Sequence, residues 1–286
     1  MISSLRDFFR GLSKAGWYLL CSIIAVLFLY PIVVTFLQSL KTSRDAASIP
    51  PSFFPQEWSL ENYTAMLNST TSLSVGRSML ISLVIALGTM IFTTILALFG
   101  GYGLSRLRFP GSNVVFFLIL ITFMIPFQAV ATPLYLVLAK VGLTNSIVGV
   151  ILVLGTFQLP FGLFIMRNSL SSIPREMEEA AMIDGCGILV TMRRVILPMA
   201  IPGLLTTALF GFFVGWNDFF APLILLNKQE LYPLTVVLSL LQTGQEGTIN
   251  WGLLQSGVFV TIFPCVILFI FLQRYYVSGL VTGALK

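Results

Sequence analysis

Histidine is absent from the 286 residues of this chain, and charged residues make up only 9% of them. Without histidine the chain lacks the commonest general base, and a zinc site of the cysteine–histidine type cannot form. The three cysteines, Cys21, Cys186 and Cys265, are an odd and widely spaced set that does not indicate a redox compartment. A soluble domain usually carries about a quarter charged residues, so this composition argues against a soluble enzyme.

Long uncharged stretches take the place of the missing charges. A helix needs about 20 apolar residues to cross the hydrocarbon core of a bilayer. Six stretches pass this test, one of them interrupted by Asp218, and they do not alternate as the strands of a membrane barrel do. The sequence therefore predicts an all-α, polytopic membrane protein with six transmembrane helices. The stretches run from Lys14 to Lys41, Arg77 to Arg106, Arg108 to Lys140, Lys140 to Arg167, Arg194 to Lys228 and Glu246 to Arg274.

The basic residues predict the orientation, because positively charged loops stay on the cytoplasmic side. With the N-terminus inside, eleven of the sixteen lie in inner segments: Arg6, Arg10, Lys14, Arg106, Arg108, Arg167, Arg175, Arg193, Arg194, Arg274 and Lys286. The outer segments hold Lys41, Arg44, Arg77, Lys140 and Lys228. We therefore expect both termini in the cytoplasm. The net charge of +5 reflects this topology, and no single basic patch indicates nucleic acid as a partner.

These stretches also predict how the chain is divided. Residues 1–16 are expected to be a cytoplasmic segment and residues 17–40 the first transmembrane helix, which is too long for a cleaved signal peptide. Residues 41–77 follow as an extracytoplasmic loop with a short helix opening at Ser59. Residues 78–276 form a five-helix core with an inner loop at 168–202, and residues 277–286 are a cytoplasmic tail.

Prolines and glycines lie within the predicted spans. A proline inside a helix frees a carbonyl and kinks the axis, which suits a pathway that bends, although prolines are also simply frequent in membrane helices. Gly211 and Gly215 form a small-xxx-small face that predicts close helix packing. The prolines concerned are Pro126, Pro133, Pro160, Pro222 and Pro264.

The inner loop 168–202, which we call the acidic loop, has the pattern of two short helices. Pro174 suits the first turn of a helix, and the acidic residues between Glu176 and Glu179 are stabilised near its positive end. Gly185 permits the left-handed backbone that ends a helix. The second stretch, Ile188–Leu197, is expected to end at Pro198. The prediction is a compact, charged protrusion on the cytoplasmic side.

The acidic loop resembles the EAA loop of binding-protein-dependent ABC importer permeases. The family pattern is Glu-Ala-Ala, a glycine four residues after the last alanine, and Ile-x-Leu-Pro after nine more. This chain has Glu179-Ala180-Ala181, Gly185 and Val195-Ile196-Leu197-Pro198, and it departs only in Val195. Tyr102–Arg106, the span with Pro126 and Pro133, Trp216-Asn217-Asp218 and the ending Val277–Lys286 look like the second permease subunit of maltose-type carbohydrate importers.

This resemblance implies a type I ABC importer permease fold, also called MetI-like, in a bacterial or archaeal cytoplasmic membrane. It implies a second, non-identical permease, two ABC ATPase subunits, an extracytoplasmic solute-binding protein, membrane lipid and a carbohydrate substrate. No cofactor is expected in this chain. The phosphate-binding pattern Gly-x-x-x-x-Gly-Lys-[Ser/Thr] does not occur in it, so ATP and Mg are expected on the partner ATPase.

The resemblance also suggests site residues. Contact with the ATPase is expected at Glu178, Glu179, Ala180, Ala181, Asp184, Gly185, Leu197 and Pro198, with a further contact from the tail at Ser278, Gly279 and Gly283. A sugar pathway needs uncharged hydrogen-bonding groups and aromatic faces. The candidates are Gln128, Thr132, Gln158, Trp216, Asn217 and Asp218. Alternatively, Trp216 anchors the chain at the membrane interface and Asn217 caps a bend.

Two other functions remain open at this stage. An ABC permease for a non-sugar solute would carry the same acidic loop. A secondary transporter driven by an ion gradient usually needs acids or histidines at the membrane midplane, and this chain offers only Asp218 inside a span. A membrane-embedded enzyme is disfavoured, because no nucleophile and base can be paired in the sequence.

Overall fold

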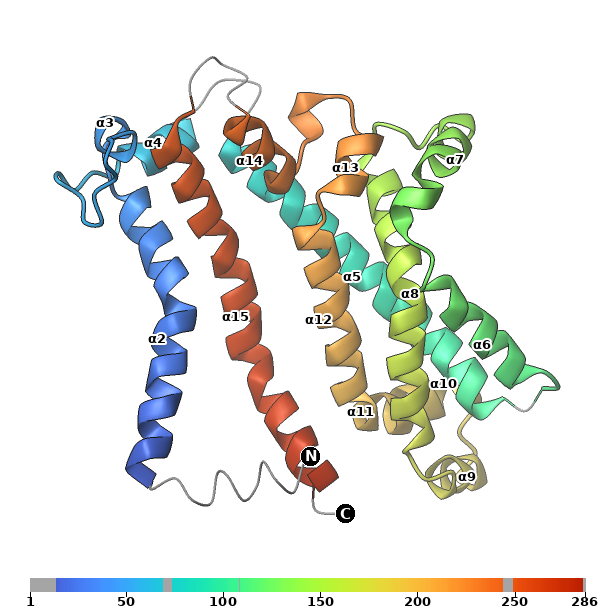
Figure 1. Ribbon diagram of the computed structural model, residues 1–286. Helices are drawn as coiled ribbons and strands as arrows, with labels where there is room; N and C mark the ends of the chain where they lie inside the picture. Colours follow the sequence, from blue (N-terminus) through green and yellow to red (C-terminus); the bar gives the residue numbers. More distant parts are fainter. Residues whose placement is uncertain (1–13, 69–73, 108, 244–248, 285–286) are drawn as a thin grey trace. The chain divides into compact units, whose positions relative to one another are not determined.

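The computed structural model describes residues 14–68, 74–107, 109–243 and 249–284; the side chains of residues 14, 15, 67, 68 and 272–284 are outside that description (Figure 1). Within these ranges the regular structure consists of helices, and strand-like pairing is confined to one isolated bridge between Lys41 and Trp58. The predicted all-α fold is confirmed. Uncharged apolar sequences favour this outcome, because a helix satisfies its backbone polar groups within one segment.

Four helices are long and apolar enough to cross a membrane: α2 (Lys14–Ser39), α5 (Val75–Arg106), α8 (Ile147–Ser171) and α15 (Trp251–Ala284). Two further pairs of consecutive helices are long and apolar enough to cross a membrane if each bent pair counts as one span. The chain turns by 97° between α6 (Ser112–Thr122) and α7 (Phe127–Lys140). It turns by 79° between Ile188–Met199 and α12 (Ile201–Asn217). The described chain thus has up to six spans, in agreement with the prediction.

The prolines for which kinks were predicted do not all interrupt their helices. Pro126 caps the N-terminus of α7 and stands at the 97° break. Helix α7 continues through Pro133, α8 through Pro160, α13 (Phe220–Leu225) through Pro222 and α15 through Pro264. A proline therefore breaks the helical path only at the first of these positions.

The chain divides into two compact units, and residues 1–68 with 240–262 form the first. It contains α2, α3 (Ser43–Ala46), α4 (Glu61–Asn68) and the start of α15. Asn62 of α4 is buried and donates hydrogen bonds to the Ser39 and Lys41 carbonyls at the end of α2. The predicted short helix thus begins two residues after Ser59, whose hydroxyl accepts from the Glu61 N–H. Phe36 of α2 packs against Phe259 of α15 with ring centroids 4.9 Å apart.

The second unit, residues 69–239 and 263–286, is built around α5, α8 and α12, which pack on one another (Figure 1). Glycines bring these helices into backbone contact. A Cβ on Gly215 of α12 would lie 2.7 Å from the Cα of Ala86, and one on Gly211 would lie 3.0 Å from the Cα of Met90. The predicted close packing of the Gly211–Gly215 face is therefore confirmed, and α5 is its partner.

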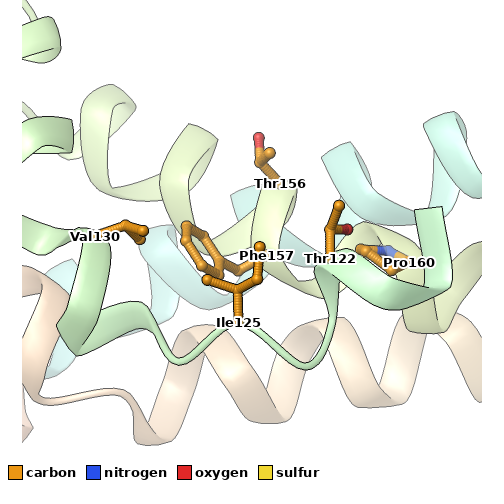
Figure 2. Close-up of a pocket in the computed structure, with 6 residues that line it drawn as sticks. All are labelled: Thr122, Ile125, Val130, Thr156, Phe157 and Pro160. Atoms are coloured by element: carbon orange, nitrogen blue, oxygen red, sulfur yellow. The ribbon is translucent and has the colours of Figure 1, made fainter. Parts of the chain in front are cut away.

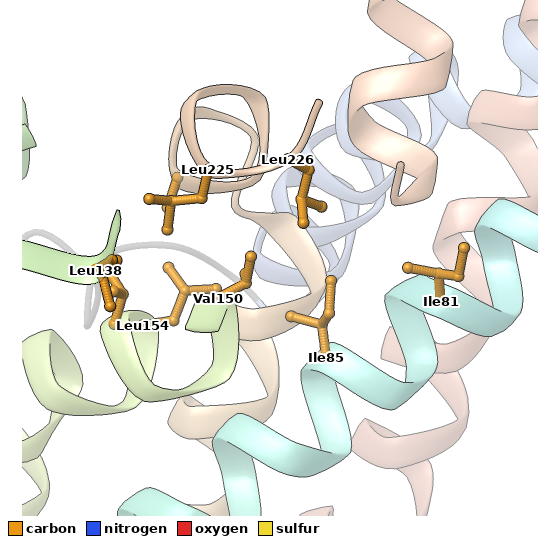
Figure 3. Close-up of a cluster of buried hydrophobic side chains, with 9 residues drawn as sticks. Ile81, Ile85, Leu138, Val150, Leu154, Leu225 and Leu226 are labelled. Carbon is orange, nitrogen blue, oxygen red and sulfur yellow. The ribbon is translucent and has the colours of Figure 1, made fainter. Parts of the chain in front are cut away.

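One end of this unit is closed by α13 (Phe220–Leu225), the 3-10 turn Gln229–Leu231 and α14 (Leu234–Gln242). Asn145 adopts a φ of 53°, and its side-chain oxygen accepts from the Asn227 and Lys228 N–H groups, so it ties the α7–α8 turn to the segment after α13. Figure 3 shows the buried apolar cluster here, contributed by α5, α7, α8 and α13. Its labelled members are Ile81, Ile85, Leu138, Val150, Leu154, Leu225 and Leu226.

Candidate coupling site and transport pathway

The first half of the acidic loop is α9 (Glu176–Ile183), whose first turn is acidic as predicted. The helix ends in a glycine turn: Gly185 has a φ of 80°, its N–H donates to the Met182 carbonyl, and the Cys186 N–H donates to the Ala181 carbonyl. This pair of bonds is a Schellman motif, which satisfies the last carbonyls of a helix and requires a left-handed residue. The glycine stop predicted from the sequence is confirmed.

The predicted ATPase-contact residues of α9 fall on two faces. Glu178 and Ala181, three residues apart and so on one side of the helix, are buried against the chain's own core. Glu179, Ala180, Asp184 and Gly185 are exposed. Only the second group is available to another subunit in the isolated chain. Glu178 and Ala181 instead hold α9 in place.

Arg106, the last residue of α5, fixes α9 through a buried ion pair. Its Nε lies 2.8 Å from Oε1 of Glu178, and the two side chains are only 5% and 10% exposed. Neither of these two atoms makes a hydrogen bond, so the contact is mainly Coulombic. Another nitrogen of the same guanidinium donates to the Leu170 and Ile173 carbonyls, each at 2.8 Å. One side chain thereby joins α5, the end of α8 and α9.

The second half of the acidic loop differs from the expected single stretch ending at Pro198. It comprises α10 (Ile188–Thr191), a π-helical turn (Met192–Ile196) and α11 (Leu197–Met199), and the axis turns only after Met199. Pro198 lies in the first turn of α11, directly after the π-helical turn. Leu197 is half-buried and Pro198 is exposed. Met192 and Ile196 are buried among Ala97, Tyr102, Met166, Leu170, Ile173 and Ala200.

Apolar side chains at the tip of the acidic loop were not predicted as site residues. Ile183 is 86% exposed, Leu189 is 74% exposed, and Ile188 is also exposed. Beside them lies an open hollow of about 390 Å³ lined by Leu189, Val190, Arg193 and Arg194. Exposed apolar groups next to basic ones indicate a surface for another protein. The signal was present in the sequence, since these residues flank the two glycines of a charged loop.

The predicted pathway residues do not form one site. Gln128 and Thr132 are exposed on one face of α7, whereas Gln158 is buried within α8. Trp216 is only 3% exposed and stacks on Phe212 with ring centroids 5.8 Å apart, so it packs inside this chain. Asn217 is exposed, and its side chain donates to the Phe213 carbonyl one turn earlier.

Asp218 stands at the junction of α12 and α13. Its carboxylate accepts from the Ala221 N–H, and its carbonyl accepts from the Thr235 hydroxyl. The first contact satisfies an N–H in the first turn of α13, and the second ties this junction to α14. Among the tail candidates, Ser278, Gly279 and Gly283 belong to the backbone of α15, but their side chains lie outside the described part.

A small pocket lies at the break between α6 and α7. Figure 2 shows its lining, drawn from the break and from α8: Thr122, Ile125, Val130, Thr156, Phe157 and Pro160. Its volume of about 160 Å³ is below the roughly 300 Å³ at which ligand pockets usually begin. Within the described lining none of the six predicted pathway residues occurs, although Gln158 directly follows Phe157. In the described residues, no group of three or more potential metal ligands is found either.

Residues 94–280 match the family described as the binding-protein-dependent transport system inner membrane component. The match covers more than half of the chain and includes the whole acidic loop. The chain belongs to this family. It is accordingly a multi-pass membrane protein and a permease subunit of an ABC importer, not an enzyme. ATPase and solute-binding protein partners follow from membership of a binding-protein-dependent transport system.

Relatives of this permease match over nearly their whole length. The diacetylchitobiose uptake system permease protein DasC of Streptomyces coelicolor is 31% identical, over 90% of this chain and 91% of its own. The arabinooligosaccharides transport system permease protein AraQ of Halalkalibacterium halodurans is 32% identical, over 92% and 93%. The glucose import system permease protein GlcU of Saccharolobus solfataricus is 31% identical, over 92% of each.

The fold of the permease also matches a solved structure. A chain from the crystal structure of a bacterial ABC transporter involved in the import of the acidic polysaccharide alginate aligns with a TM-score of 0.75. The alignment covers 93% of this permease and 99% of that chain, at 24% sequence identity. The expected ABC importer permease fold is therefore confirmed.

Proposed function

We propose that this permease moves a sugar or oligosaccharide into the cytoplasm by alternating access, driven by ATP hydrolysis on a separate subunit. Relatives named for diacetylchitobiose, arabinooligosaccharides and glucose support the substrate class. The assembly would contain a second, non-identical permease, two ATPase subunits that bind ATP and Mg, and an extracytoplasmic solute-binding protein. Both termini and the acidic loop would lie on the cytoplasmic side of a bacterial or archaeal membrane, as the distribution of basic residues indicates.

The shape and anchoring of the acidic loop support the proposal that this loop couples the ATPase to the transmembrane helices. Its outer face presents Glu179, Ala180, Asp184 and Gly185 together with the exposed apolar side chains around Leu189. Its inner face is tied to α5 and α8 through Arg106 and Glu178. A force applied to the outer face is therefore passed to two long helices, which is what a rigid-body transport step requires.

The candidate residues of the transport pathway differ in how accessible they are to a solute. Gln128 and Thr132 remain the best candidates for contact with a polar solute, because they are exposed on one face of α7. Trp216 and Gln158 are buried within the permease, and a role for them in the pathway would require movement of α8 or α12. We propose Asn217 and Asp218 as pathway residues only for a state in which the Asn217 bond to Phe213 and the Asp218 bond to Ala221 are broken.

Uptake into proteoliposomes tests the function. The permease is purified with the subunits that accompany it and reconstituted with its solute-binding protein, and labelled glucose, arabinooligosaccharides and diacetylchitobiose are supplied with ATP inside. We expect uptake of a carbohydrate only with ATP. Uptake that needs an ion gradient and no ATP would refute the proposal. A relative named for uptake of osmoprotective compounds is 32% identical, so labelled osmoprotective compounds are supplied in a parallel sample.

A matched pair of variants tests the coupling surface. Leu189 and Leu60 are both exposed leucines, on the acidic loop and on the segment before α4 respectively. Burying a leucine at an interface is worth about 1.5–3 kcal/mol, so we expect Leu189→Asp to weaken ATPase binding at least about tenfold. Leu60→Asp should leave binding unchanged. Equal ATPase affinity in both variants would place the coupling surface elsewhere.

A further inference from the structure

The loop between α3 and α4 carries an exposed apolar tip. Residues 48–55 contain no charged side chain, and Ile49 is 95% exposed, Phe54 64% and Phe53 43%. Trp58, just beyond the tip, is 66% exposed and pairs with Lys41 at the end of α2. Apolar groups this exposed on a short loop indicate an interaction surface.

The tip lies beside the membrane-spanning part of α2. Figure 1 shows this loop alongside the upper part of the helix. The Phe53 ring stacks on the Tyr30 ring with centroids 6.2 Å apart, and Phe54 packs edge-on against Phe53 at 5.0 Å. Tyr30 belongs to the 24-residue apolar span Gly16–Ser39. The aromatic cluster is thus continuous with a surface that faces the membrane.

The helix geometry gives the depth of the cluster. At about 1.5 Å per residue the span is about 36 Å long, about 6 Å more than the roughly 30 Å hydrocarbon core. Tyr30 lies nine residues before Ser39, so with the span centred its backbone is about 10 Å inside the nearer boundary. A ring stacked on Tyr30 therefore reaches the edge of the hydrocarbon.

The backbone of the tip is adapted to a place with little water. Pro50, Pro51 and Pro55 have no N–H to satisfy. The Ser52 carbonyl accepts two hydrogen bonds, from the Lys41 ammonium and the Gln38 amide, and Lys41 is only 1% exposed. An unsatisfied backbone group near the hydrocarbon costs several kcal/mol, and these contacts remove that cost at the residue preceding the aromatic pair.

We propose that Ile49, Phe53 and Phe54 form a lipid anchor that inserts into the membrane leaflet at the Ser39 end of α2. The anchor contacts the lipids at the boundary between headgroups and acyl chains, where aromatic rings are enriched. This anchor holds α4 and the loop 41–60 at a fixed height against the bilayer. The inference rests on the membrane-spanning character of the chain and not on its substrate or its ATPase.

Spin labels measure the depth directly. In the full transporter in liposomes, with the native cysteines replaced by serine, a nitroxide is attached to Ile49→Cys, Phe54→Cys or, as the control on the same loop, Glu57→Cys. Collision with oxygen reports lipid, and collision with a nickel chelate reports water. We expect the oxygen-to-chelate ratio to be several-fold higher at positions 49 and 54 than at 57.

Water or protein around the tip would give different collision rates. Equal ratios at all three positions would mean that the tip lies in water, and the proposal would be wrong. Low collision rates with both reagents would mean that protein covers the tip, which also overturns it. Measurement with and without the solute-binding protein then identifies the cover, since shielding by that protein appears only when it is added.

Discussion

The buried ion pair between Arg106 and Glu178 gives the sharpest prediction from this structure. Replacing Arg106 by Met leaves the Glu178 carboxylate, which is 10% exposed, without its counterion and leaves the Leu170 and Ile173 carbonyls without their shared donor. Removing one partner of a buried pair costs about 3–5 kcal/mol, because an uncompensated charge stays in the interior. We expect Arg106→Met to destabilise the permease by about that amount.

The reverse change should cost less. In Glu178→Met the guanidinium keeps its two carbonyl acceptors, each bond to a charged group being worth about 1.5–3 kcal/mol. We expect a loss of about 1–3 kcal/mol. The double variant contains no unpaired buried carboxylate, so its cost should be smaller than the sum of the single costs by about 1–3 kcal/mol, a range usual for directly coupled residues.

The assay is equilibrium unfolding in detergent micelles, followed by the helical circular dichroism signal, for the two single variants and the double variant. Arg77→Met is the matched control, because Arg77 is an exposed arginine on the same helix α5 and its loss should change stability by no more than about 0.5 kcal/mol. If Arg106→Met costs no more than the control, or if the two single costs simply add, the ion pair does not hold α9 in place and the reasoning fails.

Three further predictions concern backbone geometry. Gly215→Val should lower the free energy of unfolding by about 1–3 kcal/mol or prevent folding, because its Cβ would clash with the Cα of Ala86. Gly103→Ala should be tolerated, because Gly103 has open space around it. The yields and unfolding midpoints of the two variants test this difference. Gly185→Ala should cost about 1–2 kcal/mol through its φ of 80° alone, and an unchanged midpoint would contradict the motif. Asn145→Gly should lower the free energy of unfolding by about 1–3 kcal/mol, because it removes two side-chain hydrogen bonds but tolerates the positive φ. Asn145→Ala should lower it further. If both variants are as stable as the wild type, the Asn145 side chain does not hold the two segments together.

Part of this architecture follows from local patterns in the sequence. Gaps between charges located the spans, because burying a charge in hydrocarbon is costly at any position. Gly185 was identified as a helix stop since few other residues adopt a positive φ. The Gly211–Gly215 face was identified because small residues at that spacing expose the helix backbone. Each of these predictions needs only a few neighbouring residues.

Other features depend on contacts that local patterns do not contain. The sequence indicates Arg106 as a charge that sets topology and as part of the family resemblance, whereas its pairing with Glu178 appears only when α5 and α9 are placed together. Trp216 was read as a pathway or interface residue because its aromatic ring suits both, yet it stacks inside the permease on Phe212. Pro126 looks like the other prolines in sequence, and only the fold shows that the chain turns there.

The contacts made by Gly211 and Gly215 limit where this permease can deform. Main-chain atoms of α5 and α12 touch there with no side chain between them that could change rotamer and absorb a displacement. Relative sliding of the two helices would have to separate them altogether. If the two helices move together, we expect the movement at the places where the chain already changes direction, near Pro126 and Ala200.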